Sequence, residues 1–354
     1  MKYKILSMLL CLCFFAAGHG WAAPAFEPKD CPKDLKYILG MYYGNGEMFL
    51  LRENNGEVEL VYRFGQNDYT FAGSNVYPLY KEHFDSYTIN ESGPLNHLDA
   101  AVRIERSREG YGVSCSVGGN RYSRRFFAGE NGRPFRFAPA SDWQALKTAA
   151  DALPQKPAAD AAVMPAQLGT GQQAQLVDLA QAVPGLKFDL RYAQADNCFG
   201  QALTDDQRAF LDADAAQALA QAQQYLKPYG YGILVWEAYR PWSVSKIAYD
   251  ALPADKKSML PAPEAGFSHN TGRSIDVSLY LLATGEDAGM ISGFDEPSVR
   301  QYASFAGGTT LERYRRDLLR SAMQMAGFTA SETEWWHFDY GDIKGFAHLN
   351  VKPQ

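Results

Sequence analysis

Cysteine, basic charge and long apolar runs are all scarce in this chain of 354 residues. The five cysteines are too few for a fold held together by a disulfide framework. With 34 Lys and Arg against 40 Asp and Glu, the formal net charge is −6, which argues against the basic face of a nucleic-acid-binding protein. After the first 23 residues no apolar run is long enough to span a bilayer. The length predicts a globular protein of about two domains. The charge predicts that it has no nucleic-acid partner.

Residues 1–23 have the composition of a secretory signal peptide. Lys2 and Lys4 supply the positive start, an apolar run follows over residues 5–17, and small residues around Ala23 suit cleavage. The run is shorter than a spanning helix and ends in glycines, which argues against a membrane anchor. We therefore expect an exported protein, periplasmic or secreted, whose mature chain has no membrane span.

Cleavage would remove Cys11 and Cys13 and leave Cys31, Cys115 and Cys198. In an oxidising compartment two of the remaining three could form a disulfide. We favour Cys31 with Cys115 because both belong to the same candidate domain, although the sequence leaves the connectivity open.

The chain between residues 27 and 140 carries the signals of a small β-rich accessory domain. Short runs of aromatic and β-branched residues, such as 48–51, 58–64 and 101–105, alternate with Asn-Gly and Gly-Gly turns. This pattern favours a small all-β barrel or sandwich. The ligand of this domain is open, and contact with the cell wall is one alternative.

Residues 141–175 are rich in Ala, Pro and Gln, which is typical of a linker. A second domain follows over residues 176–354, where helical and strand patterns mix without a regular βαβ rhythm. That mixture predicts an α+β fold, with a mixed or antiparallel sheet and flanking helices.

Four segments of this second domain have clear periodicity. Alternation at period two predicts a strand over 186–192, and a compact apolar run predicts another over 231–236. Helical spacing predicts helices over 204–226 and 310–325. The expected buried positions on the two helices are Ala215, Ala218, Leu219, Ala222 and Leu226, and Leu311, Tyr314, Leu318, Ala322 and Met325.

The first polar motif runs from Ser268 to Leu279. Its apolar residues alternate as in a strand, so Asp276 faces away from the core that they enter. A turn at Gly272 would fold the chain back and let His269 meet Asp276. A lone histidine is more often a hydrogen-bonded core or surface residue than a metal ligand. His269 is therefore a candidate metal ligand only in combination with other ligand residues near it.

The second motif contains Glu334 and His337 in an aromatic segment, 332–338, that suggests an extended strand. Three residues apart, the two side chains would lie on opposite faces of a regular strand. A bulge or an irregular turn must reconcile them if both serve one site. The alternative is an exposed acid and a histidine packed beside tryptophans.

Arg240 forms the third motif, because it follows the strand expected over 231–236 and precedes Pro241. Proline disfavours the helical conformation of the residue before it, so Arg240 could project from a strand end into a cleft. A surface salt bridge is the commoner fate of an arginine.

Two histidines and an aspartate form a ligand set that one metal ion could share. Zinc in catalytic sites takes three protein ligands and keeps a fourth position for water. A nearby carboxylate that is not a ligand can then take the proton of that water. The combination of these residue types is far more specific than any of its members.

The three motifs resemble those of the VanX-type D-alanyl-D-alanine dipeptidases, which belong to family M15 of zinc peptidases together with D-alanyl-D-alanine carboxypeptidases. The resemblance rests on the Ser-His-x-x-Gly-x-x-x-Asp run from Ser268, the Glu-x-Trp-His run from Glu334 and the Ala-Tyr-Arg-Pro run from Ala238. It extends over about residues 176–348 and leaves the β-rich domain and the linker uncovered.

The resemblance implies a role for seven side chains. They are His269, Asp276 and His337 as ligands of one zinc ion, Glu334 as general base, Arg240 as the cation that stabilises the oxyanion, Asp295 as the anchor of the substrate ammonium group, and Ser268 in substrate binding. Two positions depart from the family pattern, because Phe267 stands where a serine is often found and Cys198 is unusual at its place.

The function implied is zinc-dependent hydrolysis of D-alanyl-D-alanine or a similar D,D-dipeptide to free amino acids, in peptidoglycan turnover or D-alanine recovery. One alternative is a D,D- or L,D-carboxypeptidase that trims peptidoglycan stem peptides with the same chemistry. The other is a non-catalytic cell-wall-binding protein, in which the β-rich domain is the working part and the zinc fold is a scaffold.

Overall fold

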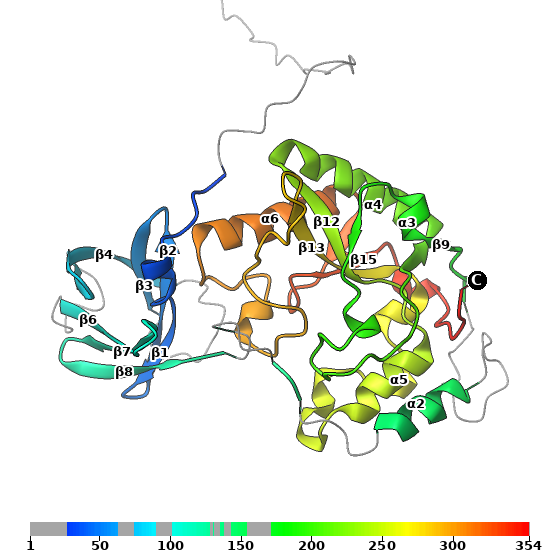
Figure 1. The fold of residues 1–354 in the computed structure, drawn as a ribbon, viewed down its shortest axis with the longest axis horizontal. Helices are drawn as coiled ribbons and strands as arrows, with labels where there is room; N and C mark the ends of the chain where they lie inside the picture. The colour runs from blue at the N-terminus through cyan, green and yellow to red at the C-terminus, as the bar shows by residue number, and fades with distance from the viewer. Residues whose placement is uncertain are drawn as a thin grey trace, which may run out of the picture.

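A computed structural model describes residues 27–62, 74–89, 101–127, 130, 135–137, 143–153 and 171–353. Figure 1 shows two bodies, a β-barrel formed by the N-terminal part and a larger α+β body formed by the C-terminal part. The predicted signal peptide, residues 1–23, lies outside the described residues.

The N-terminal body is a closed barrel of eight antiparallel strands, in which each strand pairs with the next and β1 closes on β8. The strands are β1 (Gly40–Gly44), β2 (Glu47–Asn54), β3 (Glu57–Tyr62), β4 (Asn75–His83), β5 (Ser86–Ile89), β6 (Ala101–Arg106), β7 (Gly112–Val117) and β8 (Asn120–Arg125), and the short helix α1 (Lys33–Lys36) precedes them. The expected β-rich domain is present, and its closure decides for the barrel over the sandwich.

The interior of the barrel is filled by side chains from alternating strand positions. In β6, Val102 and Ile104 are buried, whereas Arg103 and Glu105 are exposed. Tyr122 on β8 is also buried, with 1% of its surface exposed. An eight-stranded barrel is just wide enough for side chains to fill it, so this interior is a packed core.

The C-terminal body is built on a five-stranded sheet of order β10-β12-β13-β15-β14. Its strands are β10 (Lys187–Phe188), β12 (Tyr231–Glu237), β13 (Ser274–Leu281), β14 (Phe328–Ala330) and β15 (His337–Tyr340). β10 runs parallel to β12 and the other pairs are antiparallel, so the sheet is mixed, as the sequence predicts. A separate pair joins β9 (Leu176–Asp178) to β11 (Phe210–Asp212).

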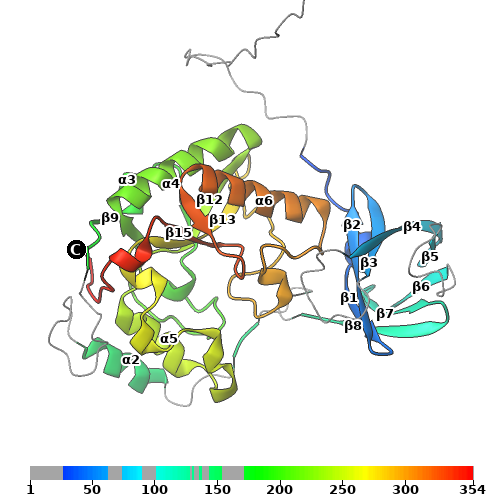
Figure 2. The same cartoon turned by 180° about the vertical axis from the view of Figure 1, so that it is seen from behind.

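Helices flank the five-stranded sheet. They are α2 (Trp143–Asp151), α3 (Leu179–Ala182), α4 (Ala213–Leu226), α5 (Trp242–Ala251) and α6 (Thr310–Met325), with the 3-10 turns η2 (Arg191–Ala193), η3 (Lys227–Tyr229), η4 (Ala254–Met259), η5 (Pro263–Ala265), η6 (Ser268–Thr271), η7 (Val299–Gln301) and η8 (Ile343–Gly345). α4 and α6 pack on one face of the sheet, and Figures 1 and 2 show α2 and α5 on the opposite side. No helix in the described part of the chain is long and apolar enough to cross a membrane.

α6 has the predicted bounds because a capping box fixes its start. Thr309 Oγ1 accepts the backbone N–H of Glu312 at 3.1 Å, and the Glu312 carboxylate accepts the N–H of Thr309 at 2.9 Å. Of the expected inward positions, Leu311 and Ala322 are buried and Tyr314 and Leu318 are half-buried against the core, whereas Met325 is wrong because it is 62% exposed. The buried stripe runs instead through Leu319 and Met323.

Two predicted elements are shorter than expected. The helix predicted over 204–226 begins only at Ala213, because the chain before it pairs with β9 as β11. All five expected buried positions of this helix are nevertheless buried. The strand predicted over 186–192 is reduced to β10, because the chain then turns into η2 and buries Tyr192.

The segment predicted as a linker, residues 141–175, contains the helix α2. α2 packs on α5, and Ala150 is buried in a core that Val244 and Ile247 of α5 share. Residues 154–170 lie outside the described residues. Part of the predicted linker therefore belongs to the C-terminal body, because it covers α5.

The favoured disulfide between Cys31 and Cys115 is not formed, and Cys198 is a free thiol as well. Cys31 precedes α1 and its thiol donates to the carbonyl of Pro32 at 3.5 Å, whereas Cys115 lies in β7 and is fully buried. Burial raises the pKa of the Cys31 thiol to about 12 and raises the pKa of the other two thiols as well. All three are therefore expected to be poor nucleophiles in the native protein.

Protein expressed without residues 1–23 is expected to carry three thiols that react only after unfolding. A chromogenic thiol reagent should label almost none of them in native buffer and all three in concentrated guanidinium. A mass spectrum of the unfolded, unreduced and alkylated protein that lacked two of the adducts would instead reveal a disulfide.

Candidate metal centre

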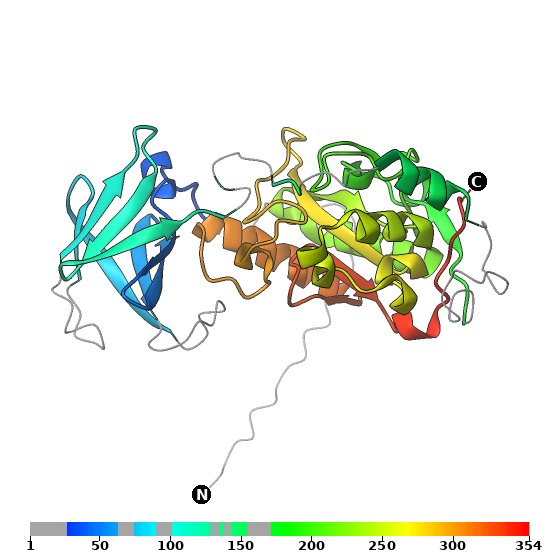
Figure 3. The same ribbon diagram turned by 90° about the horizontal axis from the view of Figure 1, so that it is seen from below.

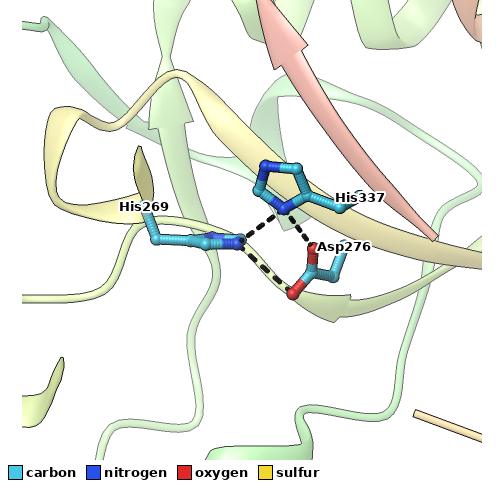
Figure 4. Close-up of side chains that lie close together, drawn as sticks. All are labelled: His269, Asp276 and His337. Atoms are coloured by element: carbon cyan, nitrogen blue, oxygen red, sulfur yellow. Dashed lines mark hydrogen bonds and ion pairs between the residues drawn. The ribbon is translucent and has the colours of Figure 1, made fainter. Parts of the chain in front are cut away.

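Three side chains that could hold a metal ion meet beside the central strands (Figure 4). His269 comes from η6, Asp276 from β13 and His337 from the first position of β15. One ligand atom from each lies within 4.8 Å of the others. The structure thus brings together the three residues that the sequence analysis expects as ligands.

Two local features produce this meeting. Gly272 adopts a left-handed φ of +74°, ends η6 and returns the chain into β13, which sets His269 against Asp276. Across the sheet, Asp276 and His337 are direct partners in the antiparallel ladder. Side chains opposite each other in such a ladder have Cβ atoms about 4.5–5.5 Å apart, close enough to share one ion.

The spacing of the donor atoms fits a tetrahedral metal site. His269 Nε2 lies 3.2 Å from His337 Nδ1 and 3.3 Å from Asp276 Oδ2, and His337 Nδ1 lies 2.9 Å from Asp276 Oδ1. Tetrahedral coordination with bonds of about 2.0–2.1 Å separates ligand atoms by about 3.3 Å. Two imidazole nitrogens and a carboxylate oxygen also form a donor set typical of catalytic metal sites.

The outer nitrogen of each imidazole is held by a protein acceptor. His269 Nδ1 donates to the carbonyl of Ala238 at 2.7 Å, and His337 Nε2 donates to Asp339 Oδ1 at 3.2 Å. These bonds leave His269 Nε2 and His337 Nδ1 free to face a metal and fix the orientation of both rings. Asp339 is not among the expected site residues, although its place two residues after His337 puts both on one face of a strand.

Charge in the cluster favours a bound cation. Burial would raise the pKa of Asp276, but His269 and His337 hold it below its usual range. Burial would lower the pKa of both histidines, yet Asp276 raises it for each of them. The buried carboxylate therefore attracts positive charge, which a divalent ion would supply while leaving the imidazoles neutral.

Glu334 is joined to the cluster by a turn instead of a strand. The strand expected over 332–338 begins only at His337, whose N–H donates to the carbonyl of Glu334 at 3.1 Å. Trp335 and Trp336 are both almost fully buried, which the alternation of a strand would not allow for neighbours on one core face. This turn is the irregularity that the three-residue spacing required.

The carboxylate of Glu334 is partly buried and, in the part of the chain that the structure describes, accepts no hydrogen bond. Burial raises its pKa, His337 lowers it and Asp276 raises it again. These interactions put Glu334 within electrostatic reach of the cluster. A carboxylate with a raised pKa beside a metal site has the proton affinity that a general base needs.

Arg240 is buried next to the cluster, which rules out a surface salt bridge for it. Its backbone N–H donates to the carbonyl of His269 at 3.1 Å, and its guanidinium carbon lies 5.1 Å from the centre of the Tyr192 ring. Its Nε lies 3.4 Å from Glu237 Oε1 without a hydrogen bond to any described residue. A buried cation with a spare donor suits an anionic oxygen at the cluster.

Glu237, which the sequence analysis missed, is the buried counter-charge of Arg240. It ends β12, and the ladder pairs it with Asp276 of the next strand. Burial raises its pKa, and Arg240 lowers it. In the sequence, only its place three residues before Arg240 indicates that the two could form an ion pair. The pairing of β12 with β13 then puts this ion pair beside Asp276.

Asp295 lies between β13 and α6 in a left-handed conformation with φ of +52°, which costs a non-glycine residue roughly 1–3 kcal/mol. Its Oδ2 accepts the Tyr192 hydroxyl at 2.6 Å and lies 3.7 Å from the Cys198 thiol. Burial raises the pKa of Asp295 to about 7, the Tyr192 hydrogen bond lowers it, and Glu334 and Asp276 raise it. Asp295 is therefore close enough to the cluster to feel its charges, and Tyr192 is a partner that the sequence analysis did not identify.

Ser268, expected in substrate binding, begins η6 with its Oγ 3.5 Å from His337 Nε2. That nitrogen is the one turned away from the other two ligands, towards Asp339. The role of Ser268 in substrate binding stays a prediction. Phe267 before it is buried against Trp242, which explains how an aromatic residue is accommodated at this position.

Comparison with known proteins matches the same part of the chain. The M15 peptidase profile described as D-ala-D-ala dipeptidase covers residues 172–351. The D-alanyl-D-alanine dipeptidase of Escherichia coli K12 is 33% identical over 165 residues, which are 47% of this chain and 84% of that protein. Proteins of the same name from Enterococcus faecalis and Streptomyces coelicolor are 33% and 28% identical over 178 and 176 residues, 45% of this chain in each case and 88% and 87% of those proteins. The chain therefore belongs to the M15 peptidase family of D-ala-D-ala dipeptidases.

Proposed function

We propose that the C-terminal body is a zinc-dependent dipeptidase that hydrolyses D-alanyl-D-alanine, or a similar D,D-dipeptide, to free amino acids. The observation that carries this proposal is the cluster of His269, Asp276 and His337 with Glu334 beside it, in a chain of this family. Export, based on residues 1–23, would put the enzyme in the periplasm or outside the cell, where peptidoglycan turnover or D-alanine recovery supplies such a substrate.

His269, Asp276 and His337 would hold the zinc ion. When bound there, zinc would polarise the scissile carbonyl and lower the pKa of a water molecule. Glu334 accepts the proton of the attacking water and returns it to the leaving amine, as its raised pKa and lack of a competing donor among the described residues allow.

Arg240 stabilises the negative oxygen that develops at the scissile carbonyl. The guanidinium is already buried and fixed between Glu237 and the Tyr192 ring, so little reorganisation accompanies the reaction. Removal of one such preorganised donor costs about 3–4 kcal/mol of transition-state stabilisation in comparable sites.

Asp295 binds the free ammonium group of the substrate through its carboxylate. It is held by Tyr192 on one oxygen and is close enough to Glu334 for the two carboxylates to interact. This role would distinguish a dipeptidase from a carboxypeptidase that trims stem peptides, because a stem peptide presents no free ammonium group at that distance from the scissile bond. Parallel assays of free D-Ala-D-Ala, its N-acetylated form and a stem pentapeptide therefore test the proposal, and a preference for either blocked substrate would contradict it.

Replacing the general base should abolish turnover without releasing the metal. Glu334→Gln keeps the size of the side chain but removes its proton affinity, so kcat should fall about 10²–10⁴-fold at unchanged zinc content. Steady-state kinetics and metal analysis measure the two quantities. Glu332→Gln, an exposed neighbour, is the matched control, and normal turnover of Glu334→Gln would remove Glu334 from this role.

Removing one metal ligand should cause the protein to lose its zinc ion. His337→Ala leaves His269 and Asp276, too few protein ligands for a catalytic zinc site, so purified protein should lose most of its zinc and its activity. Elemental analysis after dialysis against a chelator checks this outcome. His83→Ala, an exposed histidine of the barrel, should retain the ion. Full zinc content in His337→Ala would reject the ligand assignment.

Removing the charge of Asp295 should weaken binding of the free dipeptide and leave the N-acetylated dipeptide unaffected. Asp295→Asn should raise KM for free D-Ala-D-Ala by about tenfold or more, because a charged hydrogen bond is worth about 1.5–3 kcal/mol. Residual hydrolysis of the N-acetylated dipeptide should be unaffected. Asp214→Asn, an exposed position of α4, is the control, and an equal loss on both substrates would contradict the role of Asp295.

A further inference from the structure

The barrel is joined to the C-terminal body at the N-terminal end of α6 (Figure 3). Glu53 of β2 is only 1% exposed, and its Oε2 accepts the backbone N–H of Thr310 at 2.7 Å. Its own N–H donates to the carbonyl of Gly308 at 3.2 Å. A buried carboxylate at a helix N-terminus satisfies free N–H groups and complements the helix dipole, so this contact is a specific one.

Further contacts surround this anchor. Arg313 Nη2 donates to the carbonyl of Glu53 at 2.8 Å, and Lys36 Nζ of the barrel lies 2.9 Å from Glu312 Oε1. Leu50 of β2 belongs to the same buried core as Phe305 of the C-terminal body. Polar and apolar contacts together fix residues 305–313 against the barrel.

The segment that carries Asp295, residues 291–302, lies directly before the fixed residues 305–313 in the chain. Arg300 in η7 donates from Nε to the carbonyl of Ile291 at 2.8 Å, and its Nη1 lies 3.5 Å from Glu296 Oε1. The same Nη1 lies 3.9 Å from Glu130 Oε1, in the chain that leaves the barrel. Arg300 therefore ties the two ends of the turn around Asp295 to each other and towards the barrel.

The buried carboxylate of Glu296 binds both sides of the turn around Asp295. It is 3% exposed, accepts the Ser298 hydroxyl at 2.5 Å and accepts the N–H of Gly293 at 3.3 Å. Asp295 sits between these groups in its left-handed conformation, which persists only where the surroundings hold it. Arg300, Glu296 and the barrel-bound segment beyond them therefore add to the contacts within the C-terminal body that hold it, which are those of Tyr192 on Asp295 and of Trp335 on Ser292.

We propose that the barrel positions Asp295 for substrate binding, with Arg300 as the positioning residue that transmits its support. The barrel is thus part of the substrate site of this enzyme, through the segment from Ile291 to Thr310 that both bodies hold. This inference rests on the proposed function, because it assigns the ammonium anchor of that reaction to Asp295.

Glu53→Ala tests the proposal, with the exposed Glu57→Ala on the same hairpin as its matched control. Loss of the anchor should raise KM for free D-Ala-D-Ala about threefold to tenfold, the range expected for one or two hydrogen bonds, with kcat changed less than about twofold. Hydrogen exchange in residues 291–302 should become faster in Glu53→Ala and not in Glu57→Ala. A purely structural role would speed exchange without changing KM.

Arg300→Gln gives a second test if Glu53→Ala does not fold, with Arg320→Gln on α6 as its control. It should raise KM in the same range and leave zinc content unchanged. A normal KM in the folded variant overturns the proposal, whatever the exchange rates are. If the unmodified enzyme does not hydrolyse D-Ala-D-Ala, the proposed function fails instead, and the exchange of residues 291–302 then decides alone whether the barrel supports this segment.

Discussion

The contact of Asp276 with two histidines is the constraint around which the C-terminal body is arranged. One carboxylate oxygen lies 2.9 Å from His337 Nδ1 and the other 3.3 Å from His269 Nε2. The first contact requires β13 and β15 to pair in one register, and a slip by one residue would turn Asp276 to the other face. The second requires the turn at Gly272. Strand pairing and one left-handed glycine therefore set the geometry that a metal would use.

The charges around this contact favour the binding of positively charged groups. Asp276, Glu237, Glu334 and Asp295 are carboxylates that act on one another electrostatically, and Arg240 is their buried counter-charge. Burial makes such crowding costly, and the raised pKa values of Glu237, Glu334 and Asp295 are its signature. In the proposed reaction a divalent cation and the ammonium group of the substrate are the positive charges that offset it. The same electrostatic field would bind substrate and would give Glu334 its proton affinity.

The sequence predicts those features that a local pattern encodes. The helical period predicts the bounds of α6, and the polar motifs with the family that they resemble bring His269, Asp276 and His337 into one hypothesis before any fold is known. Features that depend on distant partners are missed. Met325 is exposed because the sheet contacts a different stripe of the helix. The aromatic segment before His337 is a turn because both tryptophans are buried in the core, which neighbours on one strand face could not be. Asp339, Glu237 and Tyr192 gain their roles only from strand pairing and from the approach of Asp295.

The barrel raises a question that family membership does not answer. The C-terminal half of this chain already spans 84% to 88% of the dipeptidases from Escherichia coli and Enterococcus faecalis, so those proteins have little length left for a barrel of this size. In this chain the start of α6 is bound to a buried glutamate of the barrel instead of being left to solvent. A helix start that depends on a second domain ties the order of the preceding segment to that domain. On this argument the barrel adds a requirement to substrate binding, and loosening the contact between the two bodies would weaken binding with the metal ligands left intact.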